Sequence, residues 1–370
     1  MQFGLSESQQ ILKDNARKFF AGECPITEVR RLMETPTAYD ASLWTKMAEQ
    51  GFTGIISPEE YGGLGLGKVE LILLMEEAGF ALLPGPFFST VALAAPVFDA
   101  LGTSDQKKKY LAPICNGQAR STVAMLEAGA SWDPADLQMS ARDGKLTGQK
   151  LFVTDAAVAD SIIVVARNGV FVVDAKAPGL TITPMSSMDI TRKQYSAKFN
   201  NTPAEKLGDL NALNHAFDIS TAALVAELVG GMQRCLDLTV QYAKTRKQFG
   251  KPIGSFQAVQ HQCADMYLET ESSRSAAYYA AWALEENAPD AATAVSIAKM
   301  YASDAARSIG NHGIQIHGGM GFTWENDLHL YYRRAKASET TLGDATFHRE
   351  RIARLVIDAG AASAQTAKSA

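Results

Sequence analysis

The sequence has few cysteines, no excess of basic residues and no long apolar run. Its four cysteines lie far apart and form no CxxC pair, at Cys24, Cys115, Cys235 and Cys263. This spacing argues against a disulfide framework, so we expect free thiols in a reducing compartment. A net charge of −5 argues against a nucleic-acid partner, which needs a positive surface. Because no apolar run reaches the roughly 18 residues of a membrane span, and the N-terminus lacks a signal-peptide core, we expect a cytoplasmic protein.

The hydrophobic content of the chain, 46% of 370 residues, is enough for a sizeable core and for two or three domains. Residues 1–117 carry apolar side chains at helical spacing. Ser6 and Gln9 match a capping box at the start of the first helix. The Gly-rich segment 57–67 lacks the spacing of a dinucleotide fingerprint. We therefore predict an N-terminal helical domain over 1–117.

The hydrophobic period changes twice in the rest of the chain. Between 118 and 205 it consists of short β-rich runs bounded by turn signals, of which Asn168-Gly169 suits a tight hairpin. Several short strands without intervening helices predict an antiparallel barrel or sandwich. From about 212 long proline-free helical patterns return, and over 206–370 they predict a helical bundle. The predicted fold class is therefore a multidomain α+β protein.

Two C-terminal motifs could bind a ligand. At the end of the long helix, Arg246 offers a planar fork for a phosphate and Phe249 a ring for stacking. Alternatively, Arg246 only balances the helix dipole. The Gly-rich segment 318–321 could bring backbone N–H groups close to a ligand, or it could be an ordinary helix–helix turn. His312 and His317 are five residues apart, which does not place them on one helix face, so we expect no metal site.

Two acids are candidates for a general base. Glu227 lies in a long apolar helical stretch, where apolar neighbours would raise its pKa. Alternatively, its carboxylate reaches solvent or pairs with a cation. Asp344 follows Gly343 and precedes a basic helical segment, so helix capping is its default role.

Three segments, taken in order, resemble the acyl-CoA dehydrogenase family. The most specific are YAKTRKQFGKPIGSFQAVQHQCADM (242–266) and IQIHGGMGFTWENDLHLYYRRAKA (314–337), and TGQKLFVTDAAVAD (147–160) supports them. The resemblance covers nearly the whole chain. It implies an N-terminal helical domain, a middle antiparallel β-barrel, a C-terminal four-helix bundle and FAD held between subunits.

The resemblance also assigns cofactor contacts. Arg246, Gln248 and Phe249 resemble the group that contacts the FAD diphosphate across the subunit interface. Thr154 matches the residue at the flavin edge, and Phe152 stands where the family usually has Trp. The full set of implied cofactor contacts is Arg246, Gln248, Phe249, Gln257, Gln315, Gly318, Gly319, Phe152 and Thr154.

The chain departs from the family at the flavin and substrate loop and at the base. The loop that usually reads LTEPxAGSD has Leu126 in place of a hydroxyl residue and Trp132 in place of the final Ser. The family's catalytic Glu falls on Leu342, and the alternative location of the base falls on or near Ser220. Neither position holds a carboxylate.

The resemblance implies FAD-dependent α,β-dehydrogenation of an acyl-CoA thioester, in lipid, steroid or dicarboxylate-type catabolism. Three explanations of the missing base stay open. The base has moved to Glu227, Asp344 or Asp218; or the chain is the base-deficient member of a heteromeric dehydrogenase; or it is a different enzyme or a non-catalytic structural subunit. The implied partners are an acyl-CoA substrate, an electron-transferring flavoprotein, and either identical chains in a homotetramer or a second family chain in an α2β2 heterotetramer.

Overall fold

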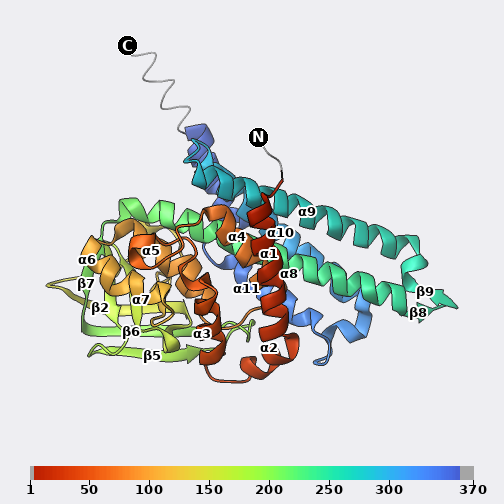
Figure 1. The fold of residues 1–370 in the computed structure, drawn as a ribbon, viewed down its shortest axis with the longest axis horizontal. Helices are drawn as coiled ribbons and strands as arrows, with labels where there is room; N and C mark the ends of the chain where they lie inside the picture. Colours follow the sequence, from red (N-terminus) through yellow and green to blue (C-terminus); the bar gives the residue numbers. More distant parts are fainter. Residues whose placement is uncertain (1–3, 359–370) are drawn as a thin grey trace, which may run out of the picture.

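The computed structural model describes residues 4–358 of the chain. Figure 1 shows the sheets at one end of the molecule, the N-terminal helices beside them and across the middle, and the long C-terminal helices extending to the other end. The predicted capping box is confirmed, because the Ser6 hydroxyl accepts a hydrogen bond from the Gln9 amide at 3.2 Å and the Gln9 side chain accepts one from the Ser6 amide at 3.0 Å. The N-terminal helices are α1 (Glu7–Glu23), α2 (Ile26–Met33), α3 (Ala41–Glu49), α4 (Lys68–Phe80), α5 (Ala95–Leu101), α6 (Ser104–Gln106) and α7 (Ala112–Cys115).

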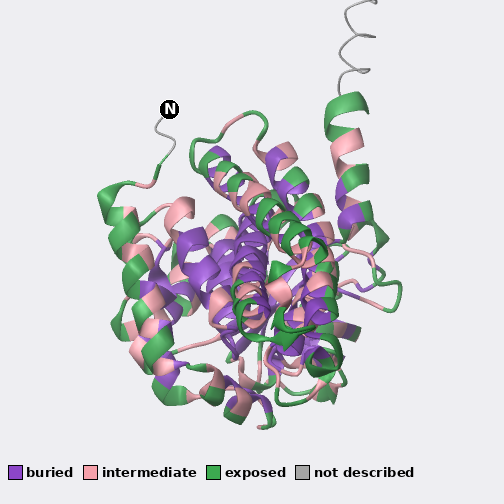
Figure 2. Cartoon of the chain, turned by 90° about the vertical axis from the view of Figure 1, so that its right-hand side faces the viewer, coloured by how far each residue is buried: buried purple, intermediate pink, exposed green. Residues whose placement is uncertain are grey.

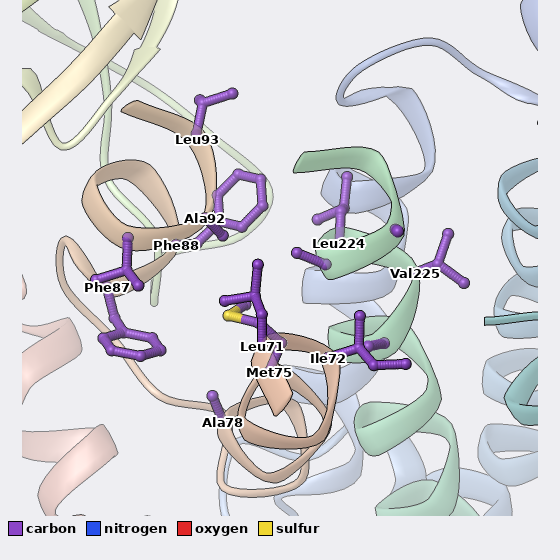
Figure 3. Packing of buried hydrophobic residues seen from close by; sticks show 14 of the residues in the cluster. Leu71, Ile72, Met75, Ala78, Phe87, Phe88, Ala92, Leu93, Leu224 and Val225 are labelled. Carbon is purple, nitrogen blue, oxygen red and sulfur yellow. The ribbon is translucent and has the colours of Figure 1, made fainter. Parts of the chain in front are cut away.

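Helix α4 packs at very short range against α8 (Leu213–Thr245) of the C-terminal region. A Cβ atom at Gly79 would lie 2.0 Å from the carbonyl oxygen of Glu227, and one at Gly230 would lie 1.9 Å from that of Glu76. Glycine is therefore required at both crossing points. Figure 3 shows the apolar side chains that fill the space around this crossing, among them Leu71, Ile72, Met75, Leu224 and Val225.

The middle region forms two small open sheets, so the predicted antiparallel barrel is not confirmed. One sheet has the strand order β1-β3-β4-β7 and the other β2-β6-β5, and β1 pairs with β3 in parallel. Helical segments contact both edge strands of the first sheet: Phe88–Ala94 lies against β1 and α5 against β7. Strand β1 also contacts β2 of the other sheet. The strands are β1 (Ser121–Ala124), β2 (Lys145–Thr154), β3 (Ser161–Ala166), β4 (Gly169–Asp174), β5 (Leu180–Met185), β6 (Gln194–Pro203) and β7 (Glu205–Gly208).

The predicted hairpin at Asn168-Gly169 is confirmed. Strands β3 and β4 pair antiparallel from Ser161 with Asp174 to Ala166 with Gly169. Of the two turn residues named in the sequence, only Gly169 has a positive φ, at 142°. Asn168 instead uses its side-chain amide to bond both the N–H and the carbonyl of Ala141, at 2.9 Å each.

The C-terminal region is helical, as predicted. Helices α8 and α10 pack against each other, and each also contacts α9 and α11. A two-stranded hairpin joins α8 to α9 at the far end of the molecule (Figure 1). Figure 2 shows the buried residues gathered between these helices and the exposed ones on their outer faces. Between residues 4 and 358, none of the helices combines the length and apolarity of a transmembrane segment. The remaining elements are β8 (Lys247–Gln248), β9 (Lys251–Pro252), α9 (Gln257–Glu285), α10 (Ala291–His317), α11 (Leu328–Thr340) and α12 (Ala345–Ala353).

Candidate active site

A cavity of about 310 Å³, here called the inner cavity, lies between the middle sheets and the end of α11. One side is apolar, with Leu93, Val123 and Leu126 among its lining residues. Polar groups come from Thr154 on β2, Gln194 on β6 and the end of α11. The remaining lining residues are Ala130, Trp132, Phe152, Ser187, Met188, Lys336, Ala337, Thr340 and Thr341.

An irregularity in β2 presents Phe152 and Thr154 to the inner cavity. The pairing of β2 with β6 shifts register between Lys150 and Val153, and Phe152 has a φ of 52°. This bulge leaves the Phe152 ring 48% exposed. The buried Thr154 hydroxyl lies 3.3 Å from the side-chain oxygen of Gln194. An aromatic ring and a hydroxyl–amide pair therefore face the same space.

A second cavity of about 370 Å³, here called the outer cavity, lies beside α8 and α12. It contains a charge pair, because the Arg351 guanidinium donates to both carboxylate oxygens of Asp218, at 2.6 and 2.8 Å. The bidentate geometry commits the Asp218 carboxylate to this arginine. The other residues that line the outer cavity are Trp132, Asp133, Pro134, Leu210, Asn211, Asn214, Phe217, Thr221, Leu342, Phe347, His348, Glu350 and Arg354.

The turn between α11 and α12 carries Leu342 on the wall of the outer cavity. Leu342 is buried and has a φ of 59°, and Gly343 follows with a φ of 98°. Lys299, from α10, donates to the carbonyls of Ser338, Glu339 and Gly343 at 3.1, 2.9 and 2.9 Å. The His348 imidazole Nε2 lies 3.0 Å from the Leu342 carbonyl oxygen. Two buried basic side chains thus hold the backbone of this turn.

Burial changes the pKa of both basic groups. Desolvation lowers the pKa of Lys299 to about 7, against the opposing charges of Glu339 and Asp344. Desolvation, assisted by the charge of Lys299, lowers the pKa of His348 to about 4. His348 is therefore neutral at physiological pH, and its Nε2–H donates to Leu342.

Glu227 lies in a buried ion cluster on the other side of α11. Its Oε1 accepts hydrogen bonds from Arg192 and, at 2.9 Å, from Arg334. Arg334 also donates to Asp189 at 2.6 Å. Glu227 borders a void of only about 20 Å³ and lines neither the inner nor the outer cavity. The geometry thus favours pairing with a cation, which was the alternative interpretation of this residue.

Asp344 is the N-cap of α12. Its Oδ1 accepts a hydrogen bond from the Phe347 amide at 2.8 Å. Ser220 is buried in α8, and its hydroxyl donates to the Ala216 carbonyl at 2.9 Å. Among the described residues, none of the sequence-based candidates for the base lines the inner cavity.

A second group of predicted site residues lies at the far end of the bundle, by the β8–β9 hairpin (Figure 1). There the Tyr242 ring stacks on His317 at 4.3 Å, which joins the end of α8 to the end of α10. Phe249, at the hairpin tip, is 90% exposed, with a φ of 51°. The structure does not bring this group to the inner cavity of the same chain. Its exposed members are Arg246, Gln248, Phe249, Gln257, Gln315, Gly318 and Gly319.

Two family models match the chain: the acyl-CoA dehydrogenase N-terminal domain over residues 6–118 and the acyl-CoA dehydrogenase C-terminal domain over residues 210–357. The chain belongs to the acyl-CoA dehydrogenase family. A relative in this family, the acyl-CoA dehydrogenase IpdE2 of Mycolicibacterium smegmatis, is 31% identical over 352 residues, which are 95% of this chain and 98% of the relative.

Solved structures of acyl-CoA dehydrogenase type have the same fold. PigA with FAD and proline superposes with a TM-score of 0.88 at 26% identity, over 96% of this chain and 98% of PigA. The ChsE4-ChsE5 complex from Mycobacterium tuberculosis gives 0.87 at 28% identity, again over 96% and 98% of the two chains. The likeness therefore includes the middle sheets, which neither family model covers.

Several residues that shape the site of this acyl-CoA dehydrogenase chain were missed from the sequence. Lys299 interrupts an apolar stretch of α10, and a lone lysine in such a stretch was an available signal. Asp155 directly follows Thr154 and is fully buried, which raises its pKa to about 6 although the Ser89 hydroxyl donates to it at 2.8 Å. Arg192 and Asp189 gave no such signal, because they lie in a polar segment. In residues 4–358 no three potential metal ligands cluster.

Proposed function

We propose that this chain binds FAD and takes part in the α,β-dehydrogenation of an acyl-CoA thioester, as the base-deficient subunit of a heteromeric acyl-CoA dehydrogenase. The family's reaction is the oxidation or reduction of an acyl-CoA thioester. The observation that carries the finer proposal is the lining of the inner cavity. Among the described residues that line it, none is Asp, Glu or His. Such a cavity can hold a ring system but offers no carboxylate or imidazole to remove a proton.

The inner cavity fits the ring system of a flavin. Leu126 and Phe152 supply apolar and aromatic surface, and the Thr154 hydroxyl and the Gln194 amide supply hydrogen-bonding groups for a polar edge. In the assembled dehydrogenase, bound FAD would supply the acceptor for a hydride equivalent from the β-carbon of the thioester. The chain's own residues hold the ring and exclude water from it.

The exposed group at the far end of the bundle supports binding between subunits. Arg246 offers a charge-assisted contact for a phosphate, and Phe249 offers an uncovered ring. A Cβ atom at Gly318 or Gly319 would meet nothing within 4 Å, so the backbone there is open to a ligand. Since these residues lie far from the inner cavity of their own chain, we propose that they contact the FAD of a neighbouring subunit.

A partner chain is the simplest source of the base. The three acids considered for a relocated base are all engaged: Glu227 with two arginines, Asp218 with Arg351, and Asp344 with the start of α12. The ChsE4-ChsE5 complex is an example of two different family chains assembled together. We therefore propose an α2β2 heterotetramer with a second family chain, reoxidised by an electron-transferring flavoprotein, and keep the homotetramer as the alternative.

Flavin absorbance per chain tests the assembly. The chain is expressed alone and with a family chain that keeps the missing Glu, and each product is purified. We expect the co-purified pair to be yellow and to lose its flavin absorbance when mixed anaerobically with acyl-CoA thioesters. A yellow, thioester-reactive chain without a partner would replace the heteromer with the homotetramer. A pair that binds FAD but reacts with no thioester would favour the non-catalytic subunit, for which Leu342 at the base position is the supporting observation.

The variant Arg246→Ala tests the FAD contact. Losing a hydrogen bond to a charged group costs about 1.5–3 kcal/mol, so FAD affinity should fall by about 10- to 150-fold. Lys247→Ala removes the neighbouring exposed cation and is the matched control, with FAD affinity expected to change little. Equal FAD retention in the two variants would contradict the assignment of Arg246.

A further inference from the structure

The inner and outer cavities share one lining residue among those that the structure describes, Trp132. The turn between α11 and α12 also faces both cavities, because Thr341 lines the inner cavity and Leu342 lines the outer one. The indole of Trp132 and this turn therefore stand between the two spaces.

The indole is held by a hydrogen bond of its own, and the next residue along the chain makes two further contacts. Its Nε1–H donates to the Thr340 carbonyl at 2.9 Å, at the end of α11. The next residue, Asp133, accepts a hydrogen bond from the Ala135 amide at 3.0 Å and faces Arg354 at 3.4 Å across the outer cavity. A hydrogen bond and an ion pair thus join the loop that carries Trp132 and Asp133 to the C-terminal helices, at the place where the two cavities meet.

We infer that Trp132 is the specificity-determining residue that closes the inner cavity of this chain to acyl thioesters while leaving it open to the flavin ring. The inference rests on the proposed function, which puts the flavin in the inner cavity. A thioester seated in the outer cavity, beside Arg351 and Leu342, would meet the indole on the side that faces the inner cavity. The family's motif has Ser at this position, and a Ser side chain would leave the passage open.

The closing side chain and the position of the missing carboxylate lie at the same place in the structure. The chain has Leu342 where a base is usual and Trp132 where a small side chain is usual, and both lie on the partition between the cavities. Both differences act at the place where the reacting carbons would lie. The chain's inner cavity then retains a flavin-binding shape without admitting substrate, and substrate turnover takes place in the partner chain's site.

Thioester binding to the FAD-loaded full chain tests the closure. The probe is crotonyl-CoA, an enoyl thioester whose binding needs no base, and the readout is the perturbation of the flavin absorbance band. We expect no perturbation in the wild type at millimolar probe and a saturable perturbation in Trp132→Ser, with affinity at least about tenfold higher. Trp132→Phe keeps a ring and loses the N–H donor, so it separates bulk from hydrogen bonding and should stay closed. Trp282→Ser, at a half-exposed site on α9, is the control for loss of a tryptophan.

The outcomes separate this inference from the proposed function. A perturbation in the wild type equal to that in Trp132→Ser would show that the indole closes nothing. If no form retains FAD, alone or with a partner chain, the proposed function fails. The closure is then measured by calorimetric titration of crotonyl-CoA into the flavin-free wild type and Trp132→Ser, whose folding is checked by thermal unfolding. Equal binding in both, or none in either, overturns it.

Discussion

Two buried basic side chains, one within helix α11 and one packed against its end, are compensated in different ways. Arg334, in the middle of the helix, pairs with the carboxylates of Asp189 and Glu227. Lys299 packs against the end of the same helix and donates to backbone carbonyls and the Ser303 hydroxyl. Desolvation acts to lower the pKa at both sites. At Arg334 the two carboxylates outweigh desolvation and raise the pKa, whereas at Lys299 the charges of Glu339 and Asp344 do not.

The difference distinguishes two structural tasks. The Arg334 cluster joins segments far apart in the sequence, because Asp189 precedes β6 and Glu227 lies in α8. It fixes the middle sheets to the helical bundle. Lys299 instead fixes one turn, the one that forms the partition between the two cavities. We therefore expect the first site to control the stability of the whole chain and the second to control the shape of the candidate site.

The largest loss of stability is expected for Arg334→Met. The variant leaves Asp189 without its cation and Glu227 with Arg192 alone, and breaking a buried ion pair on one side costs about 3–5 kcal/mol. We expect a decrease of about 4–5 kcal/mol in the free energy of unfolding, measured by urea denaturation. Arg333→Met, at the adjacent half-buried arginine, should cost less than about 1 kcal/mol. Similar losses in the two variants would show that the cluster does not hold the domains together.

A smaller loss is expected for Lys299→Met, which keeps much of the volume and removes the donor. Three buried carbonyls lose a partner at about 1 kcal/mol each, so the free energy of unfolding should fall by about 3 kcal/mol. Because the turn carries Leu342, crotonyl-CoA binding to the Trp132→Ser form should weaken in the double variant. The matched control for the stability measurement alone is Lys336→Met, whose partly exposed partner is Glu339. Unchanged stability in Lys299→Met would mean that water replaces the ammonium group.

The third prediction concerns pH and His348. Burial depresses the pKa of this group to about 4, against 6.5 in the unfolded chain, so between these values the unfolded state binds a proton that the folded state does not. Stability is therefore lost as the pH falls from about 6.5 toward 4, by about 2–3 kcal/mol over the whole window. His348→Gln keeps a donor for Leu342 and removes this titration. Its stability, measured by denaturation from pH 4 to 7.5, should vary less than that of the wild type, and equal slopes would contradict the assignment.

Much of the local structure could be predicted from the sequence because its causes are local. The Ser6–Gln9 capping box and the proline-free α8 depend on residues within a few positions of one another. The hairpin before Gly169 was predicted on the turn dipeptide, although the Asn168 side chain also bonds a segment 27 residues away. The predicted antiparallel barrel was not confirmed, because the two sheets stay open and strand pairing is long-range. Nothing in β1 itself indicates that it pairs in parallel with β3.

The candidate site was predictable only where residue type decides the chemistry. Thr154 and Phe152 were singled out by a motif, and the structure puts both on the inner cavity. The pairing of Glu227 was open in the sequence, because its partners Arg192 and Arg334 are 35 and 107 residues away. The partition by Trp132 needed the fold, since it depends on the contact of a middle-region loop with the carbonyl of Thr340, 208 residues later.

The smallest effect is expected at Asp344, where two substitutions separate capping from catalysis. Asp344→Ala removes the side-chain acceptor of the Phe347 amide and should cost about 1 kcal/mol, whereas Asn caps a helix about as well as Asp and should cost almost nothing. Asp344→Asn also abolishes basicity. If the partner chain supplies the base, thioester turnover by the Asn form of the heteromer should match that of the wild type. A fall of about a hundredfold or more, the scale of general-base catalysis, would instead identify Asp344 as the base. Glu227→Gln, made in the same heteromer, extends the comparison to the Arg334 cluster. This variant should be less stable than the wild type, but its turnover per folded molecule should be unchanged.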